Sequence, residues 1–162
     1  MSALAFRAAC ELTNLIRKRE ISSRELLEHY LTRIEEFNPK LNAVVTIDAD
    51  RARERADAAD QALARGESWG PLHGLPITVK DTFETAGVST TAGARRFSEY
   101  VSMTDAVSVA RLQAAGAVLM GKTNTPVASD RLPSAAARRI RVWAARLSAS
   151  SEIPRRRAPM GE

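Results

Sequence analysis

Two short apolar runs, residues 77–79 and 117–120, constrain the fold most, because a segment with helical spacing lies between them. That segment begins near Asp105, carries apolar residues at helical intervals and ends at Gly116. A strand, a helix and a strand in this order predict a parallel crossover unit, which is expected to be right-handed. The predicted fold class is therefore α/β.

The upstream half of the chain has the signals of helices around one further strand. Ser22 and Glu25 have the spacing of a capping box, so a helix is predicted to start there, and residues 38–39 (Asn-Pro) are predicted to stop it. Residues 43–47 are β-branched and are interpreted as a strand, although a run this short could also be a buried helix. Residues 49–65 predict a surface helix. Leu12, Leu15 and Ile16 indicate a further amphipathic helix, which precedes the capping box at Ser22.

Charge is divided unevenly along the chain. Residues 131–162 hold eight Arg and two Glu, whereas residues 1–130 hold 16 Lys and Arg against 17 Asp and Glu. A nearly neutral body lacks the concentrated basic surface that nucleic acid requires, so nucleic acid is not expected as a partner. Cys10 is the only cysteine, which excludes an internal disulfide framework. With no signal-peptide pattern and no apolar run of about 20 residues, we expect a cytoplasmic protein without a membrane span.

Lys80 and Asp81 directly follow the first apolar run, and a loop containing Lys122 is predicted after the second. The carboxyl ends of parallel strands share one edge of a sheet, which is where ligand sites form. Side chains alternate along a strand, so Lys80 and Asp81 are expected to face opposite ways. In the plain interpretation Lys80 reaches solvent. In the alternative it is buried, its neutral form is favoured, and it serves as a general base.

Two ordered blocks carry a family resemblance. The run GPLHGLPITVKDTFETAGVSTTAG, followed by TDAVSVARLQAAGAVLMGKTNTP, resembles the N-terminal part of the amidase signature family, whose members hydrolyse amides with a Ser, cis-Ser and Lys triad. The resemblance extends from about Ser22 to Asp130. It implies an incomplete amidase signature fold, in which N-terminal helices precede the first strands of a mixed sheet flanked by helices. It also implies a small-molecule amide substrate and neither a metal nor another cofactor.

The resemblance also assigns roles to single residues. Lys80 matches the family's catalytic lysine, which acts as a base through the bridging cis-serine. Lys122 matches a loop near the site and is expected to have a structural role, as is His73. His29 is placed on a predicted helix, so no histidine-based triad or metal cluster is expected.

The sequence departs from the family pattern after Lys122. The family continues into a Gly- and Ser-rich segment that carries the cis-serine, and then to the nucleophilic serine, but here the only later glycine is Gly161. The pair Ser150 and Ser151 is rejected as a substitute, because a backbone that approaches substrate closely needs flanking glycines. We therefore expect a chain truncated before the nucleophilic serine and inactive alone.

The amino-acid composition of the sequence changes at residue 131. The expected organisation is an N-terminal part of an amidase signature domain over residues 1–130 and an Arg-, Ala- and Pro-rich tail over residues 131–162, interpreted as out-of-frame translation or disorder. The same family resemblance leaves open the glutaminase component of the aminoacyl-tRNA amidotransferase. A third hypothesis is a non-catalytic module whose basic tail binds nucleic acid or a membrane surface.

Overall fold

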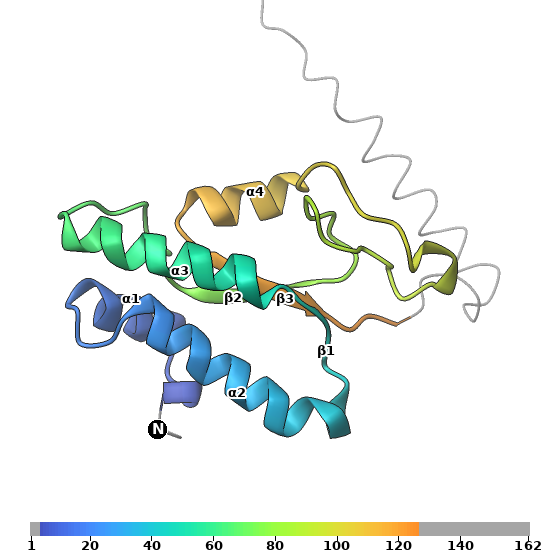
Figure 1. Ribbon diagram of the computed structural model, residues 1–162, viewed down its shortest axis with the longest axis horizontal. Helices are drawn as coiled ribbons and strands as arrows, with labels where there is room; N and C mark the ends of the chain where they lie inside the picture. The colour runs from blue at the N-terminus through green and yellow to red at the C-terminus, as the bar shows by residue number, and fades with distance from the viewer. Residues whose placement is uncertain (1–3, 127–162) are drawn as a thin grey trace, which may run out of the picture. The chain divides into compact units, whose positions relative to one another are not determined.

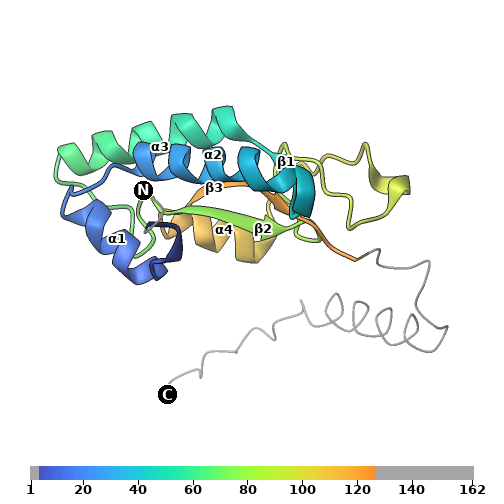
Figure 2. The same cartoon turned by 90° about the horizontal axis from the view of Figure 1, so that it is seen from below.

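The computed structural model describes residues 4–126, and these form a three-stranded sheet with helices on both sides (Figures 1 and 2). The strand order is β1-β3-β2, with β3 antiparallel to β1 and parallel to β2. The strands are β1 (Val44–Ile47), β2 (Pro76–Lys80) and β3 (Val118–Thr123). The α-helices are α1 (Ala9–Arg17), α2 (Ser23–Leu41), α3 (Ala49–Ala64) and α4 (Val107–Ala114), and two 3-10 helices cover Leu4–Phe6 and Arg95–Phe97.

The predicted parallel crossover is confirmed. The chain leaves β2, passes through a long loop and α4, and returns as β3 beside β2 in parallel register. Figure 2 shows α2 and α3 on one side of the sheet and α4 on the other. The predicted mixed sheet with flanking helices is therefore present. Among residues 4–126, no helix is both long enough and apolar enough to cross a bilayer.

Two apolar clusters hold the helices on the sheet. The first joins α2, α3 and β3, and alanines on α3 allow its backbone to lie close to the strand. Its buried members are Leu27, Leu31, Ala52, Ala56, Val118 and Met120. The second joins α1 and α2 to the segment entering β2, through Leu12, Ile16, Leu26 and Leu75. The periodicities seen in the sequence mark these buried faces.

The start of α2 was predicted correctly and its end was not. Ser22 caps the helix, accepting a hydrogen bond from the Glu25 N–H at 3.0 Å. The helix continues through Pro39 to Leu41, beyond the predicted stop. The Asn38 side chain explains the difference, because it accepts hydrogen bonds from the N–H groups of residues 43 and 44 and so ties the last turn to β1.

Strand β3 is also longer than predicted, because residues 121–123 were interpreted as a loop. Gly121 makes the extension possible: a Cβ at this position would lie 2.4 Å from the Thr46 carbonyl oxygen of the neighbouring strand. Lys122 follows it inside the sheet with its side chain completely buried. Close pairing of β1 with β3 therefore requires a residue without a side chain at position 121.

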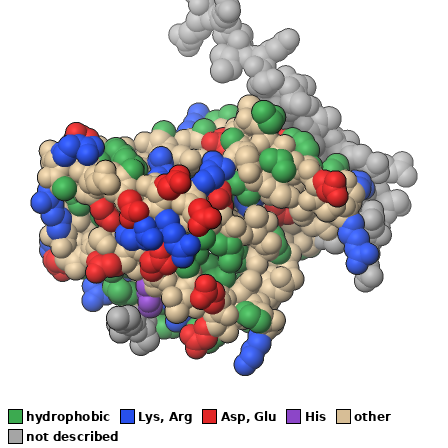
Figure 3. Space-filling view, viewed as in Figure 1, with side chains coloured by type: hydrophobic (Ala, Val, Ile, Leu, Met, Phe, Trp, Pro, Cys, Tyr) green, Lys and Arg blue, Asp and Glu red, His purple; other side chains and the backbone are tan. Residues whose placement is uncertain are grey.

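Helices α2 and α3 are joined at the surface by charged side chains. Glu28 accepts hydrogen bonds from Arg53 and Arg24, each with an Nε–Oε1 distance of 2.8 Å. The hydrogen bond from Arg53 is the largest cause that lowers the pKa of Glu28, to about 2. Figure 3 shows the charged side chains interspersed over this face.

Candidate functional site

Lys80 ends β2 at the edge where β3 also ends. The residue pairs with Thr123, and its carbonyl oxygen accepts a hydrogen bond from the Phe83 N–H at 2.9 Å. The side chain is exposed, which agrees with the plain interpretation of Lys80 and contradicts the alternative in which it is buried. Alternation along β2 is the physical reason, since it buries Val79 and directs Lys80 to the opposite face. The catalytic role of Lys80 stays a prediction.

Asp81 faces the interior, as alternation predicted. Only 1% of the residue is exposed, and its carboxylate accepts hydrogen bonds from the backbone N–H and the hydroxyl of Thr91. Its cationic partner is Lys122, with 3.6 Å between Nζ and Oδ1. The interpretation that Lys80 and Asp81 do not form a simple ion pair is therefore consistent with the structure.

Lys122 is the buried lysine of this region. Its Nζ donates to the Phe83 carbonyl and the Thr90 hydroxyl, both at 2.8 Å, and to the Ser89 carbonyl at 3.4 Å. Burial lowers the pKa of the Lys122 ammonium below its ordinary value, and the Asp81 carboxylate opposes that shift. The surrounding groups are all acceptors, which suits an ammonium with three protons to donate.

The contacts of Lys122 and Asp81 shape the loop that follows β2. Lys122 reaches the carbonyls of Phe83 and Ser89, and Asp81 holds Thr91, so residues 83–91 of the loop fold around one buried ion pair. The Ala92 N–H also donates to the Asp81 carbonyl at 3.2 Å. These hydrogen bonds are consistent with the structural role expected for Lys122. Sequence reasoning missed its burial, although an apolar run that continues through glycine into lysine was a usable signal.

The two histidines lie away from this edge in the sequence and in the fold. His73 is 1% exposed, its Nδ1 accepts the Trp69 N–H at 3.0 Å, and its Nε2 lies 3.1 Å from the Ala59 carbonyl. These backbone contacts fit the structural role predicted for His73. His29 lies on α2, as predicted.

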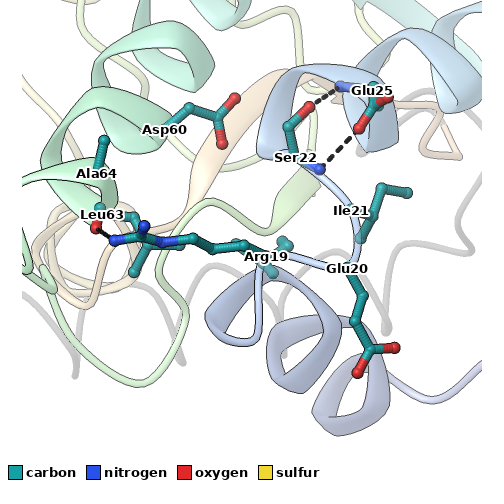
Figure 4. Close-up of a pocket in the computed structure, with 9 residues that line it drawn as sticks. Arg19, Glu20, Ile21, Ser22, Glu25, Asp60, Leu63 and Ala64 are labelled. Atoms are coloured by element: carbon teal, nitrogen blue, oxygen red, sulfur yellow. Dashed lines mark hydrogen bonds between the residues drawn. The ribbon is translucent and has the colours of Figure 1, made fainter.

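Two hollows open where α1 meets α2, and neither is lined by Lys80, Asp81 or Lys122. One has a volume of about 410 Å³ and the other about 700 Å³. In the smaller one, Figure 4 shows Ser22 and Glu25 bonded to each other and Arg19 bonded to the Leu63 carbonyl. Asp60 accepts the Ser23 N–H at 2.7 Å. These side chains cap helices and are not arranged for chemistry.

The remaining predictions concern residues outside the described part of the chain. They are the Arg-rich tail over residues 131–162 and the serine pair Ser150 and Ser151.

Comparisons of the sequence and of the structure with known proteins point to the same family. The sequence model of the Amidase family matches residues 25–129. The chain is 47% identical over 118 residues to the A subunit of the glutamyl-tRNA(Gln) amidotransferase of Halorhodospira halophila, a match that covers 73% of this chain and 24% of that protein. The corresponding protein of Anaeromyxobacter sp. strain K is 51% identical over 106 residues, covering 65% and 22%.

Solved structures agree with the sequence matches. The peptide amidase of Stenotrophomonas maltophilia superposes with a TM-score of 0.70 at 35% identity, covering 74% of this chain and 25% of that one. A bacterial aryl acylamidase of the amidase signature family gives 0.71 at 32% identity, covering 75% and 26%. The chain therefore spans about a quarter of the length of the relatives it matches.

Proposed function

Because the chain belongs to the Amidase family, we propose that it is the lysine-bearing part of an amidase-type hydrolase acting on the carbon–nitrogen bond of small amides. In this proposal Lys80 is the base. Its neutral amine accepts, through a bridging cis-serine, the proton of the serine that attacks the amide carbonyl. The leaving amine takes up a proton, and water then hydrolyses the acyl-serine. The two serines in this scheme are those of the family pattern and are not residues identified in this chain.

The position of Lys80 is the observation that supports the proposal. The residue stands at the carboxyl end of β2, next to the end of the parallel strand β3, and its side chain is exposed. Such an edge is where α/β folds place their ligands. An amine on this side can be reached by hydroxyl groups that another segment presents. The match from residue 25 to residue 129 also supports a domain boundary near residue 130.

The 162 residues hold no glycine-flanked serine after Lys122, so on this proposal they supply one arm of the triad and not the nucleophile. We expect the purified chain not to hydrolyse a simple aryl amide above the rate of buffer. Turnover that follows the chain through purification and disappears on Lys80→Met would contradict the one-arm assignment, and turnover unaffected by Lys80→Met would contradict the role of Lys80.

A chimera tests Lys80 as a base directly. Residues 22–126 would replace the matching segment of the Halorhodospira halophila protein, which is 47% identical over the matched region. We expect the chimera to hydrolyse an amide, and Lys80→Met to lower kcat by about 10²–10⁴-fold, the usual contribution of a positioned base. Lys40→Met is the matched control, since Lys40 is an exposed lysine on α2. Equal losses in the two variants would contradict the role of Lys80.

A second candidate within the family is the glutaminase component of the aminoacyl-tRNA amidotransferase. It is favoured by the curated relatives, since the chain is 47% identical to one glutamyl-tRNA(Gln) amidotransferase protein and 51% identical to another. Glutamine as the amide donor and a cytoplasmic location follow from this candidate. Microcalorimetry that detects glutamine but no other small amide binding to the chain would favour it. Binding of simple aryl amides without glutamine would favour the general amidase.

A further inference from the structure

Lys80 has an acidic neighbour in the sequence, and the charge of that neighbour bears on how much of the Lys80 amine is neutral. A nearby negative charge favours the protonated form of a lysine, and only the neutral amine accepts a proton. Asp81 is the next residue along the chain. If Lys80 is to act as the proposed function requires, the negative charge of Asp81 has to be compensated or directed away from the Lys80 amine.

We propose that Lys122 is a positioning residue for Lys80: it holds the Asp81 carboxylate on the buried face of the sheet and compensates its charge. The inference rests on the proposed function for its purpose. Its geometry is that of the buried pair, in which the Lys122 Nζ lies 3.6 Å from Asp81 Oδ1 and both residues are at most 1% exposed.

The pair is placed to act on Lys80 through the backbone. Val79 and Lys80 pair with Lys122 and Thr123 across the parallel strands, and the Asp81 N–H donates to the Thr123 carbonyl at 3.0 Å. The turn after Lys80 closes when the Phe83 N–H donates to the Lys80 carbonyl, and the Phe83 carbonyl in turn accepts from Lys122. The backbone of Lys80 is thus fixed on both sides by bonds that lead to Lys122.

Each member of the pair keeps hydrogen-bond partners if the other is removed. Without Asp81, the Lys122 ammonium still has the carbonyls of Phe83 and Ser89 and the hydroxyl of Thr90 as acceptors. Without Lys122, the Asp81 carboxylate still accepts two hydrogen bonds from Thr91. Replacing one partner with a neutral residue therefore removes a charge of known sign from the surroundings of Lys80.

Other carboxylates on the neighbouring segments already have partners. Glu84 accepts from the Tyr100 hydroxyl at 2.8 Å, Asp105 accepts from the Ala86 N–H at 2.8 Å, and Asp48 pairs with Arg51 at 3.3 Å. Of these three only Asp48 is paired with a cation, and all three are unchanged in the variants below, so a difference in Lys80 reactivity between variants reports on Lys122 and Asp81.

The test measures how fast Lys80 is acylated in the full 162-residue chain, using limiting acetic anhydride between about pH 7 and pH 10 and peptide mass spectrometry. Lys40 in the same sample is the internal standard, because it is an exposed lysine on another element, α2, and makes no contact with the Lys122–Asp81 pair. Only the neutral amine reacts, so the ratio of Lys80 to Lys40 modification follows the neutral fraction of Lys80. The measurement requires no amide turnover. Failure of the inference about Lys122 and Asp81 can therefore be distinguished from failure of the chimera, which tests the proposed function.

We expect shifts in opposite directions. Lys122→Met removes a positive charge and should slow Lys80 acylation at about pH 8 by about 2- to 10-fold, whereas Asp81→Asn removes a negative charge and should speed it by a similar factor. The double variant should return near the wild-type ratio. A merely structural role would loosen the loop in both single variants and change reactivity in the same direction.

Equal directions in the two single variants, or no change relative to Lys40, would overturn the inference. Circular dichroism establishes that each variant is folded. If Lys122→Met does not fold, Asp81→Asn decides alone, because it preserves the shape of the side chain, and a ratio that stays constant or falls would overturn the inference.

Discussion

At the scale of single residues, the stability of this fold depends on a lysine that the family resemblance does not use for catalysis. Lys122→Met should lower the free energy of unfolding by about 3–5 kcal/mol, because it leaves the buried Asp81 carboxylate without its cation. The double variant Asp81→Asn/Lys122→Met should lose less, since neither charge then remains buried. Urea unfolding followed by far-UV circular dichroism measures both. A double variant less stable than Lys122→Met would contradict this view of the pair.

Sequence reasoning at this scale found the right edge of the sheet, but it considered burial for Lys80 and not for Lys122. Alternation along β2 correctly separated Lys80 from Asp81, because it depends only on local strand geometry. The partner of Asp81 could not be found in the same way. Lys122 lies far along the chain from Asp81, and only the parallel register of β2 and β3 brings the two together.

At the scale of elements, Gly121 determines whether β1 can pair with β3. Gly121→Ala would place a Cβ 2.4 Å from the Thr46 carbonyl oxygen, so the backbones must separate. We expect a loss of about 1–3 kcal/mol in the free energy of unfolding, typical of overpacking. Hydrogen exchange should show faster exchange of the β1 and Asp48 amides, while the α1 amides, which lie in a different cluster, keep their protection. Unchanged exchange in β1 would contradict the steric argument.

Elements with local signals were predicted well, and their ends were not. The capping box at Ser22 and the apolar runs of β2 and β3 are properties of adjacent residues, so the sequence alone reveals them. The ends of α2 and β3 depend on tertiary contacts. Asn38 binds residues 43 and 44, and Lys122 finds its acceptors in a loop that is distant in the sequence.

At the scale of the whole molecule, α2 and α3 must stay together for the sheet to keep its cover, and a pH titration can test how much their charged contact contributes. Hydrogen bonding from Arg53, followed by Arg24, lowers the pKa of Glu28 from 4.5 to about 2. A carboxylate whose pKa is lower in the folded state stabilises the fold above its unfolded pKa and loses that contribution as the pH falls. The stabilisation should therefore be complete above about pH 4.5 and vanish as the pH approaches 2.

Glu28→Gln tests that contribution. The variant should be less stable than the wild type by about 1 kcal/mol at about pH 7, a modest value because 39% of the Glu28 side chain is exposed and solvent screens the contact. The difference should shrink steadily between pH 4.5 and about 2, as measured by urea unfolding at each pH. Glu35→Gln, on the exposed face of the same helix, should show a difference that does not follow this window. A Glu28→Gln deficit that persists unchanged at about pH 2 would mean that packing, and not the charge of Glu28, joins the two helices.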